Sequence, residues 1–325
     1  MNGTQLPRLV AIVGPTAIGK TDLALRLADC IGIEVVSADS RQIYRGMDIG
    51  TAKPTAEEQQ RLPHHLLDVV DPDQTLTLAE YQELAYQAID SIVARGKLPL
   101  LVGGSGLYVW AVIENWRIPR VPPQVELRQR LEQQAAQLGA AQLHRQLTEV
   151  DPVAAASIHP HNIRRVIRAL EVYYTSGEPI SRQQQRGDLR YRTLIIGLTA
   201  ERHWLYARAD ERVEDMLRRG LIEETQRLLL AGYSAQAPAM SGLGYKQIVA
   251  SLRGEYPLSE AVRRIKTGTH RFIRQQYTWF RKNDTRIHWQ RQPVDMRMVL
   301  SLVTEFLARE QSRSTQDEHQ WLLHK

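Results

Sequence analysis

The stretch that decides the fold is RLVAIVGPTAIGKT, residues 8–21. Its first half, RLVAIVG at 8–14, is rich in β-branched residues and ends in glycine, which is typical of a buried parallel strand. Its second half, GPTAIGKT at 14–21, matches the phosphate-loop pattern G-x-x-x-x-G-K-S/T at every defined position. The run GKTDLALRLADCIG at 19–32 is amphipathic and ends at a glycine, so we expect a helix after the loop.

A loop of this kind binds phosphate mainly through its backbone. Successive N–H groups line a concavity, and the N-terminus of the following helix adds positive potential. Lys20 is placed to bridge phosphates, and the Thr21 hydroxyl is a predicted ligand of Mg²⁺, the expected cofactor. The predicted diphosphate-binding residues are Gly14, Pro15, Thr16, Ala17, Ile18, Gly19, Lys20 and Thr21. The loop indicates phosphates rather than ATP, so a kinase, a nucleic-acid-dependent ATPase and a transferase that releases pyrophosphate all stay open.

Strands and helices alternate along the rest of the first hundred residues. IEVVSAD at 33–39 is a candidate second strand, LAEYQELAYQAIDSIVARGK at 78–97 has helical spacing, and KLPLLVGGSGLYVW at 97–110 begins as another buried strand. This alternation predicts an α/β fold with a P-loop NTPase-like parallel sheet as its core.

The sequence changes character at RIPRVPP, residues 117–123, where prolines mark a boundary. The patterns that follow are all helical until YRTLIIGLTA at 191–200, which returns to a strand. We therefore predict a core of residues 1–117 and 191–310, which carries the catalytic site and the C-terminal helices, and an all-helical insertion domain of residues 118–190. Residues 311–325 are polar and are predicted to form a mobile tail.

Composition narrows the class of protein. Of the 325 residues, 43% are hydrophobic, which is enough for a substantial core, yet the longest apolar runs are only as long as a strand. The single cysteine, Cys30, excludes an internal disulfide framework and a Cys-rich zinc site. The N-terminus, MNGTQLPR, lacks the features of a signal peptide. Together these observations predict a soluble cytoplasmic protein with no membrane partner.

Positive charge is concentrated in one part of the chain. The net charge is +6, and the segment 261–291 carries nine Lys and Arg residues against one acid, Asp284. A solvated helix face usually mixes charges of both signs. The imbalance therefore favours a polyanionic partner such as nucleic acid.

Asp39 is the candidate for acid–base chemistry or for metal binding. An ATPase of this fold usually has a hydrophobic strand that ends in an acid, which holds magnesium. Here the strand LPLLV at 98–102 ends in GGSG without an acid. Asp39, at the end of its own strand, is thus left with either the metal role or the role of a base. A third interpretation is that Asp39 merely caps a helix.

Several blocks of the chain resemble the tRNA dimethylallyltransferase family, and they occur in the order found in that family. The resemblance covers nearly the whole chain up to about residue 290. The matching blocks are GPTAIGKT (14–21), SADSRQIYRGMDIGTAKP (37–54), PHHLLDVVDP (63–72), GGSGLY (103–108), RRVIRALEVYYTSGEP (164–179), LYARADERVEDMLRRG (205–220), GLGYKQI (242–248) and RQQYTWFRK (274–282).

The resemblance implies a reaction. The dimethylallyl group of dimethylallyl diphosphate is transferred to the exocyclic amine of the adenosine on the 3′ side of the tRNA anticodon, with no consumption of ATP. By resemblance, Asp39 is the general base, a role that suits an amine whose lone pair is delocalised into the ring. Ser105 stands where the family usually has threonine, and Arg208 matches an arginine linked to the pyrophosphate. Arg212 lies four residues further along the same helix face, so spacing alone does not separate it from Arg208.

The resemblance also implies that the protein is a monomer whose helical insertion contacts the anticodon stem-loop. Phosphate contacts from arginines would give affinity and register rather than a choice of sequence. The predicted tRNA-binding residues are Asp39, Ser40, Arg41, Gln42, Arg164, Arg165, Arg168, Gly244, Tyr245, Lys246, Arg274, Gln276, Thr278, Trp279 and Arg281.

Three alternatives remain at this point. An adenylate isopentenyltransferase would use the same chemistry on a free nucleotide, although it would need neither the insertion nor the basic segment. A small-molecule kinase would consume ATP. A non-catalytic tRNA-binding protein would not explain the intact phosphate loop together with Asp39.

Overall fold

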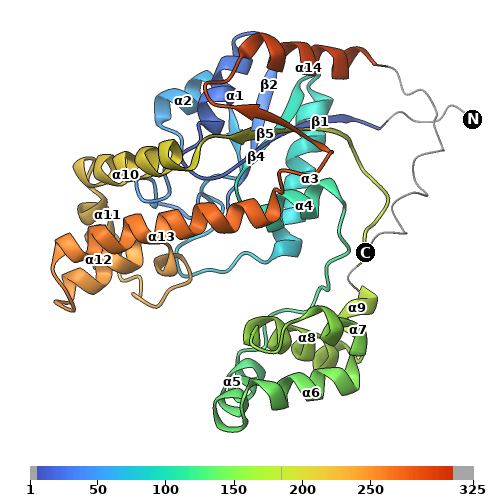
Figure 1. The fold of residues 1–325 in the computed structure, drawn as a ribbon, viewed down its shortest axis with the longest axis vertical. Helices are drawn as coiled ribbons and strands as arrows, with labels where there is room; N and C mark the ends of the chain where they lie inside the picture. The colour runs from blue at the N-terminus through green and yellow to red at the C-terminus, as the bar shows by residue number, and fades with distance from the viewer. Residues whose placement is uncertain (1–5, 184, 310–325) are drawn as a thin grey trace, which may run out of the picture. The chain divides into compact units, whose positions relative to one another are not determined.

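The computed structural model of the chain describes residues 6–183 and 185–309 (Figure 1). The predicted mobile tail, 311–325, lies outside the described residues. The chain forms two compact units. The first comprises residues 1–75, 88–106 and 190–325, and the second comprises residues 76–87 and 107–189.

The first unit is built on a six-stranded sheet whose order is β3-β2-β4-β1-β5-β6, with every pair of neighbours parallel. The strands are β1 (Arg8–Val13), β2 (Ile33–Ala38), β3 (His64–His65), β4 (Leu98–Gly103), β5 (Arg192–Thr199) and β6 (Ile287–Arg291). The predicted α/β fold with a parallel sheet is thereby confirmed.

The register of the central strands brings three functional segments to one edge of the sheet. Gly103 pairs with Val13 of β1 and also with Ala38 of β2. The carboxyl ends of β1, β2 and β4 therefore lie level with one another. The phosphate loop, Asp39 and the GGSG turn each follow directly after one of these ends. Ligands of open α/β sheets bind at this edge.

The strands are buried because helices cover the sheet. Every residue of β2 is buried, as is every residue of β1 after Arg8, which matches the continuous apolar runs of parallel strands. Strand residues Val10 and Ile196 share a core cluster with helix residues Leu23, Leu205 and Val299. The helices of this unit are α1 (Lys20–Ala28), α2 (Ala56–Arg61), the second half of α3 (Leu78–Ala94), α10 (Arg202–Arg218), α11 (Leu221–Leu230), α12 (Tyr245–Leu252), α13 (Leu258–Trp279) and α14 (Met296–Ala308).

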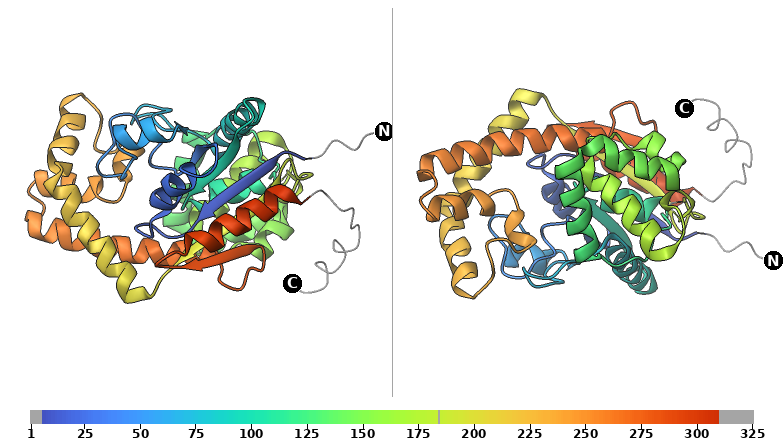
Figure 2. Two further views of the ribbon diagram at one scale, coloured as in Figure 1. Left: turned by 90° about the horizontal axis from the view of Figure 1, so that it is seen from above. Right: turned by 90° about the horizontal axis from the view of Figure 1, so that it is seen from below.

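Helices α10 to α13 pack against one another as a group beside the sheet (Figure 2). The longest of them, α13, carries much of the basic segment. Its face toward α10 includes Ile273, which belongs to the sheet's core cluster together with Leu205 and Ala209 of α10. None of the described helices combines the length and the hydropathy needed to cross a membrane.

The second unit is helical. It contains most of α4 (Gly106–Ile113), then α5 (Val125–Leu138), α6 (Ala140–Val150), α7 (Pro152–Ser157), α8 (Ile163–Ser176) and α9 (Ile180–Gln183). Its core includes Leu131, Leu143, Leu147, Val166 and Leu170. The insertion was expected at 118–190; this unit takes in residues 118–189 of that stretch together with residues 76–87 and 107–117.

A buried carboxylate ties this helical core together. Glu171 of α8 is fully buried and accepts hydrogen bonds from the backbone N–H of Gln124 (2.7 Å) and from both Nε and Nη2 of Arg128 (2.7 and 2.8 Å). Arg168 donates to the same carboxylate at 2.7 Å. The buried charge is thus compensated by two guanidinium groups, as a stable buried ion requires.

Candidate active site

A cavity of about 460 Å³ opens at the carboxyl edge of the sheet within the first unit. The phosphate loop lines one wall with residues 16–21. The turn after β2 contributes Asp39 and Gln42, and α10 contributes Arg208 and Arg212. The residues predicted for diphosphate binding and for the base therefore face a common space.

Two glycines give the phosphate loop its shape. Gly14 has a φ of +147°, and a Cβ there would lie 2.8 Å from the carbonyl oxygen of Leu198. Gly19 has a φ of +94° and forms the N-cap of α1. Both positions exclude ordinary side chains, because positive φ and close backbone contact favour glycine. The loop can then present its N–H groups together with the N-terminus of α1.

Lys20 folds back over the loop. Its ammonium group donates hydrogen bonds to the carbonyl oxygens of Gly14 (3.0 Å) and Pro15 (2.8 Å). Although the side chain as a whole is only partly buried, the burial of its ammonium group lowers the pKa of Lys20 to about 8. Asp39 opposes this shift and Arg212 adds to it. Asp39, the predicted base, and Lys20, the lysine predicted to bind phosphate, therefore interact electrostatically.

Arg212 lies directly against the phosphate loop. Its guanidinium group donates to Oγ1 of Thr16 at 3.3 Å, and burial lowers its pKa although Asp39 opposes the effect. Arg208 lines the same cavity, with its guanidinium carbon 5.5 Å from the centre of the Trp204 ring. The structure thus places Arg212, the residue that spacing could not separate from Arg208, next to the residues predicted to bind diphosphate.

Asp39 lies in a turn rather than at the start of a helix. Its Oδ1 accepts a hydrogen bond from the backbone N–H of Arg41 at 2.8 Å, and the next helix, α2, begins only at Ala56. The helix-cap interpretation is therefore wrong. Ser105 lies close by, because its Oγ accepts from the backbone N–H of Ser40 at 3.0 Å and donates to the Ser40 hydroxyl at 3.2 Å.

Gln276 proves to be a buried link between two loops. Its side-chain oxygen accepts from the backbone N–H of Thr16 at 2.8 Å, and its side-chain nitrogen donates to the carbonyl of Gly104 at 3.1 Å. The residue is only 4% exposed, although it contributes to the lining of the cavity. Gln276 thus holds the phosphate loop against the GGSG turn, and its contact with tRNA stays a prediction.

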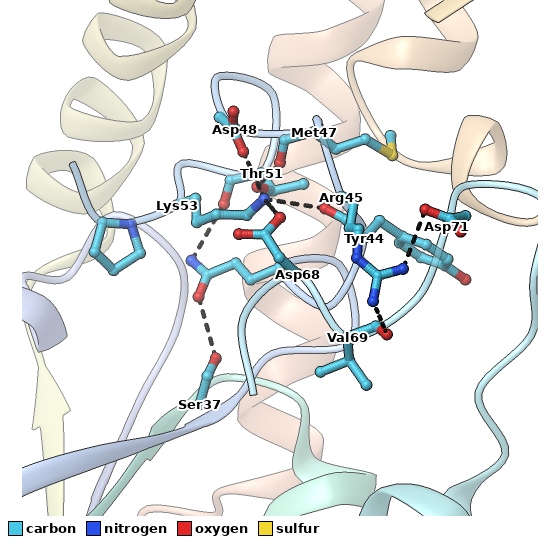
Figure 3. A network of polar contacts seen from close by, with 12 residues as sticks. Ser37, Tyr44, Arg45, Met47, Asp48, Thr51, Lys53, Asp68, Val69 and Asp71 are labelled. Atoms are coloured by element: carbon cyan, nitrogen blue, oxygen red, sulfur yellow. Dashed lines mark hydrogen bonds and ion pairs between the residues drawn. The ribbon is translucent and has the colours of Figure 1, made fainter. Parts of the chain in front are cut away.

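Polar contacts of a buried lysine stabilise the segment between Asp39 and Pro54 (Figure 3). The ammonium group of Lys53, a residue only 5% exposed, donates to the carbonyl of Tyr44 at 3.0 Å and to the carboxylates of Asp48 (2.5 Å) and Asp68 (2.6 Å). A buried charge paired in this way fixes the shape of the loop.

The side-chain amide of Gln42 takes part in the same network through both its nitrogen and its oxygen. Its nitrogen donates to the carbonyls of Thr51 (3.4 Å) and Ala52 (3.1 Å), and its oxygen accepts from Ser37 at 3.2 Å. Gln42, Thr51 and Ala52 all line the cavity. This network therefore stabilises part of the lining of the cavity.

The other predicted tRNA-binding residues fall into two groups. The exposed ones are Arg164, Arg165, Lys246, Arg274, Thr278 and Arg281. Arg41 is partly buried, and its guanidinium group donates to the carbonyl of Pro238 (3.2 Å) and to the hydroxyl of Ser241 (3.4 Å). Tyr245, by contrast, is 1% exposed, so its expected side-chain contact with RNA is replaced by a structural role. Arg168 is engaged with Glu171. Trp279 packs against Gly106.

Sequence reasoning did not find Glu224 of α11. It is 1% exposed and accepts hydrogen bonds from the backbone N–H of Asp48 and from the hydroxyl of Tyr245. A signal was present, because Leu221, Glu224 and Leu228 recur at helical spacing on one face. A glutamate within such an apolar stripe indicates a buried carboxylate with partners.

Known proteins resemble this chain over most of its length. A tRNA dimethylallyltransferase of Roseiflexus sp. is 55% identical over 84% of this chain and 90% of its own. The full-length tRNA isopentenylpyrophosphate transferase from Bacillus halodurans matches with a TM-score of 0.67 and 42% identity, covering 93% of this chain and 95% of its own. A eukaryotic dimethylallyltransferase acting on tRNA matches with a TM-score of 0.80 and 25% identity over 95% of this chain and 81% of its own. Because the IPP transferase family model also matches residues 42–283, the chain belongs to the IPP transferase family.

Proposed function

We propose that the protein transfers the dimethylallyl group of dimethylallyl diphosphate to the exocyclic amine of the adenosine on the 3′ side of the tRNA anticodon, releasing diphosphate. The single observation that carries the proposal is the shared cavity. The phosphate loop and Asp39 both line this cavity, which supports a reaction in which a departing diphosphate and an attacking amine occupy one space. The relatives named as tRNA dimethylallyltransferases support this reaction over the alternatives.

The departing group is handled by the phosphate loop. As the bond between the allylic carbon and the diphosphate oxygen breaks, negative charge grows on the diphosphate. The backbone N–H groups of the loop, Lys20 and Arg212 are positioned to stabilise that charge, and groups already aligned cost no reorganisation during the reaction.

Asp39 acts on the other reactant. The exocyclic nitrogen of adenine forms a bond to the allylic carbon and must lose a proton. A carboxylate within hydrogen-bond reach accepts that proton, which contributes typically about 10²–10⁴-fold. The target base must leave its stack to reach the cavity, and a single-stranded anticodon loop makes this extrusion cheap.

Mg²⁺ fits the donor set at the loop. The Thr21 hydroxyl and the Asp22 carboxylate both line the cavity, and such hard oxygen donors suit Mg²⁺. The described residues contain no cluster of three or more His, Cys, Asp or Glu side chains that could hold a metal ion. Mg²⁺ usually keeps several waters and binds substrate phosphates together with only one or two protein ligands. When bound, Mg²⁺ supplies additional positive charge to the diphosphate.

The exposed arginines of the helical unit, Arg164 and Arg165, are proposed to contact phosphates of the anticodon stem. We further infer a cytoplasmic monomer, as the family resemblance implies. These assignments concern affinity for RNA and do not alter the chemistry in the cavity.

The test is to incubate the protein with Mg²⁺, dimethylallyl diphosphate and one acceptor, and to analyse the nucleosides by mass spectrometry. An anticodon stem-loop with adenosine at the target position should gain one dimethylallyl group, and AMP should not. A product from AMP alone would instead identify an adenylate isopentenyltransferase. Hydrolysis of ATP coupled to phosphorylation of a small molecule would identify a kinase.

A further inference from the structure

Glu224 occupies a pocket of backbone N–H groups. Its Oε2 accepts hydrogen bonds from the N–H groups of Asp48 and Ile49, both at 2.9 Å, and its Oε1 accepts from the N–H of Gly50 at 3.1 Å. Three successive N–H groups that converge in this way form a nest that binds an anion. The protein fills this nest with its own carboxylate, which comes from a helix more than 170 residues away.

Tyr245 completes the contact. Its hydroxyl donates to Oε1 of Glu224 at 2.6 Å, and both residues are 1% exposed. The ring lies so close to the loop that a Cβ on Gly50 would be 2.5 Å from it. Glu224 and Tyr245 together, named here the loop clamp, therefore fix the backbone of residues 48–50. Lys53 adds a contact from within the same segment, to the carboxylate of Asp48.

The clamped backbone leads directly into the active site. Thr51 and Ala52 follow the nest in the chain, line the cavity and accept the hydrogen bonds of the Gln42 side chain. We propose, on the basis of the proposed function, that Glu224 is a positioning residue: by holding residues 48–50 it sets the wall of the cavity that receives the acceptor adenine.

This role predicts that a change in the clamp affects the two substrates differently. None of the described hydrogen bonds joins Glu224 or Tyr245 to the phosphate loop. A change in the clamp should therefore impair use of the RNA and leave diphosphate binding intact. A merely structural role would weaken both, because loss of folded protein removes both sites in proportion.

The Glu224→Gln variant tests the proposal with little change of shape. One carboxylate oxygen becomes an NH₂ group that faces N–H and O–H donors, so at least one donor loses its partner. We expect kcat/KM for the anticodon stem-loop to fall by about 10- to 100-fold, the size expected for misplaced reacting groups. The Kd of Mg²⁺–pyrophosphate should stay within about twofold of the wild-type value. Glu223→Gln, at the exposed neighbouring position, is the matched control and should behave as wild type.

Tyr245→Phe provides a second, milder variant in case Glu224→Gln fails to fold. It removes one hydrogen bond and keeps the nest filled, so kcat/KM for the stem-loop should fall by a smaller factor, with pyrophosphate binding again unchanged. The proposal is overturned if either folded variant uses the stem-loop as well as the wild type does. It is equally overturned if the affinity for Mg²⁺–pyrophosphate falls in proportion to kcat/KM for the stem-loop.

Hydrogen exchange separates this inference from the proposed function. The amides of residues 48–50 should be protected in the wild type and should exchange faster in Glu224→Gln, whatever reaction the protein catalyses. If the wild type transfers no dimethylallyl group, the proposed function fails, and the exchange rates still decide whether the clamp exists. Unchanged exchange at these amides would contradict the clamp itself.

Discussion

The Ser105 hydroxyl accepts a hydrogen bond from the backbone N–H of Ser40 at 3.0 Å. This contact joins the turn after β4 to the residue that follows the predicted base, Asp39. The backbone N–H of Ser105 in turn donates to the carbonyl of Ala38 at 3.3 Å. Ser105 therefore fixes the position of Asp39 from the neighbouring strand.

We expect Ser105→Ala to lower the turnover number and Ser105→Thr to preserve it. The alanine variant leaves the N–H of Ser40 without its partner, at a cost of about 1–3 kcal/mol, and loosens the turn that carries Asp39. Threonine keeps the hydroxyl. Single-turnover rates with saturating donor measure the effect. Equal rates for the alanine and threonine variants would show that the hydroxyl does not position the base.

Binding of the donor should depend on pH through Lys20. Its pKa is lowered to about 8 by burial, so the free protein loses this charge as pH rises through 8. A bound diphosphate favours the charged form, and binding above pH 8 must therefore take up a proton. Below pH 8, titration of Lys20 should not change the affinity for dimethylallyl diphosphate. Above pH 8, the affinity should fall by up to about tenfold per pH unit.

The control for this prediction is Lys20→Arg, since an arginine stays protonated throughout the range. Any titration of the donor itself is common to both proteins, so the difference between the two profiles isolates Lys20. Calorimetry of donor binding in buffers of different ionisation enthalpy would detect the proton directly. Parallel profiles for the two proteins would contradict the role assigned to the lysine.

Arg212 should matter more than Arg208 for the diphosphate. Arg212 donates to Thr16 of the phosphate loop, whereas Arg208 stacks over Trp204. Loss of a charged hydrogen-bonding group costs about 1.5–3 kcal/mol. Arg212→Ala should weaken pyrophosphate binding by about 10- to 150-fold. Arg208→Ala is the matched comparison and should weaken it less; the reverse order would show that Arg208 is the contacting residue.

Much of the catalytic centre could be predicted from the chain because local rules determine it. The phosphate loop follows a buried strand, and Asp39 and the GGSG turn follow two others. In a parallel sheet such strand ends lie at one edge. The proximity of these three segments could therefore be predicted without knowing any contact between distant residues.

Contacts between distant segments could not be predicted. Gln276 accepts a hydrogen bond from Thr16, a residue 260 positions away in the chain, and no sequence pattern in either segment predicts this contact. Arg208 and Arg212 share a helix face, so only the packing of α10 against the loop separates them. Arg168 was predicted as an RNA contact together with Arg164 and Arg165, yet its own guanidinium compensates the buried Glu171. In each case tertiary packing decides which side chain remains available.

The helical unit should depend on Glu171 for its stability. Breaking a buried ion pair by removing one partner costs about 3–5 kcal/mol, so Glu171→Gln should open α5 to α8 more readily. Native-state hydrogen exchange of these helices measures the opening free energy within the full chain. Glu149→Gln, at an exposed position of α6, should leave it unchanged. Equal exchange in both variants would show that the buried carboxylate contributes nothing.

Acid should weaken the same unit. Burial alone would raise the pKa of Glu171, but hydrogen bonds from Arg128, the backbone of Gln124 and Arg168 outweigh it and lower the pKa below the ordinary value of 4.5. The stabilisation is therefore complete above the pKa of the unfolded chain and is lost as pH falls through the lower, folded value. Exchange of α8 amides, corrected for intrinsic rates, should reveal this loss in the wild type and not in Glu171→Gln.

The most direct test of the central claim is a pair of measurements on the Asp39→Asn variant, which keeps the shape of the side chain and removes its basicity. We expect formation of dimethylallyl-adenosine on an anticodon stem-loop, followed by mass spectrometry, to fall by about 10²–10⁴-fold. Pyrophosphate binding, measured by calorimetry, should be nearly unchanged. Turnover that survives the substitution would contradict the assignment of Asp39 as the base that prepares the RNA amine for attack.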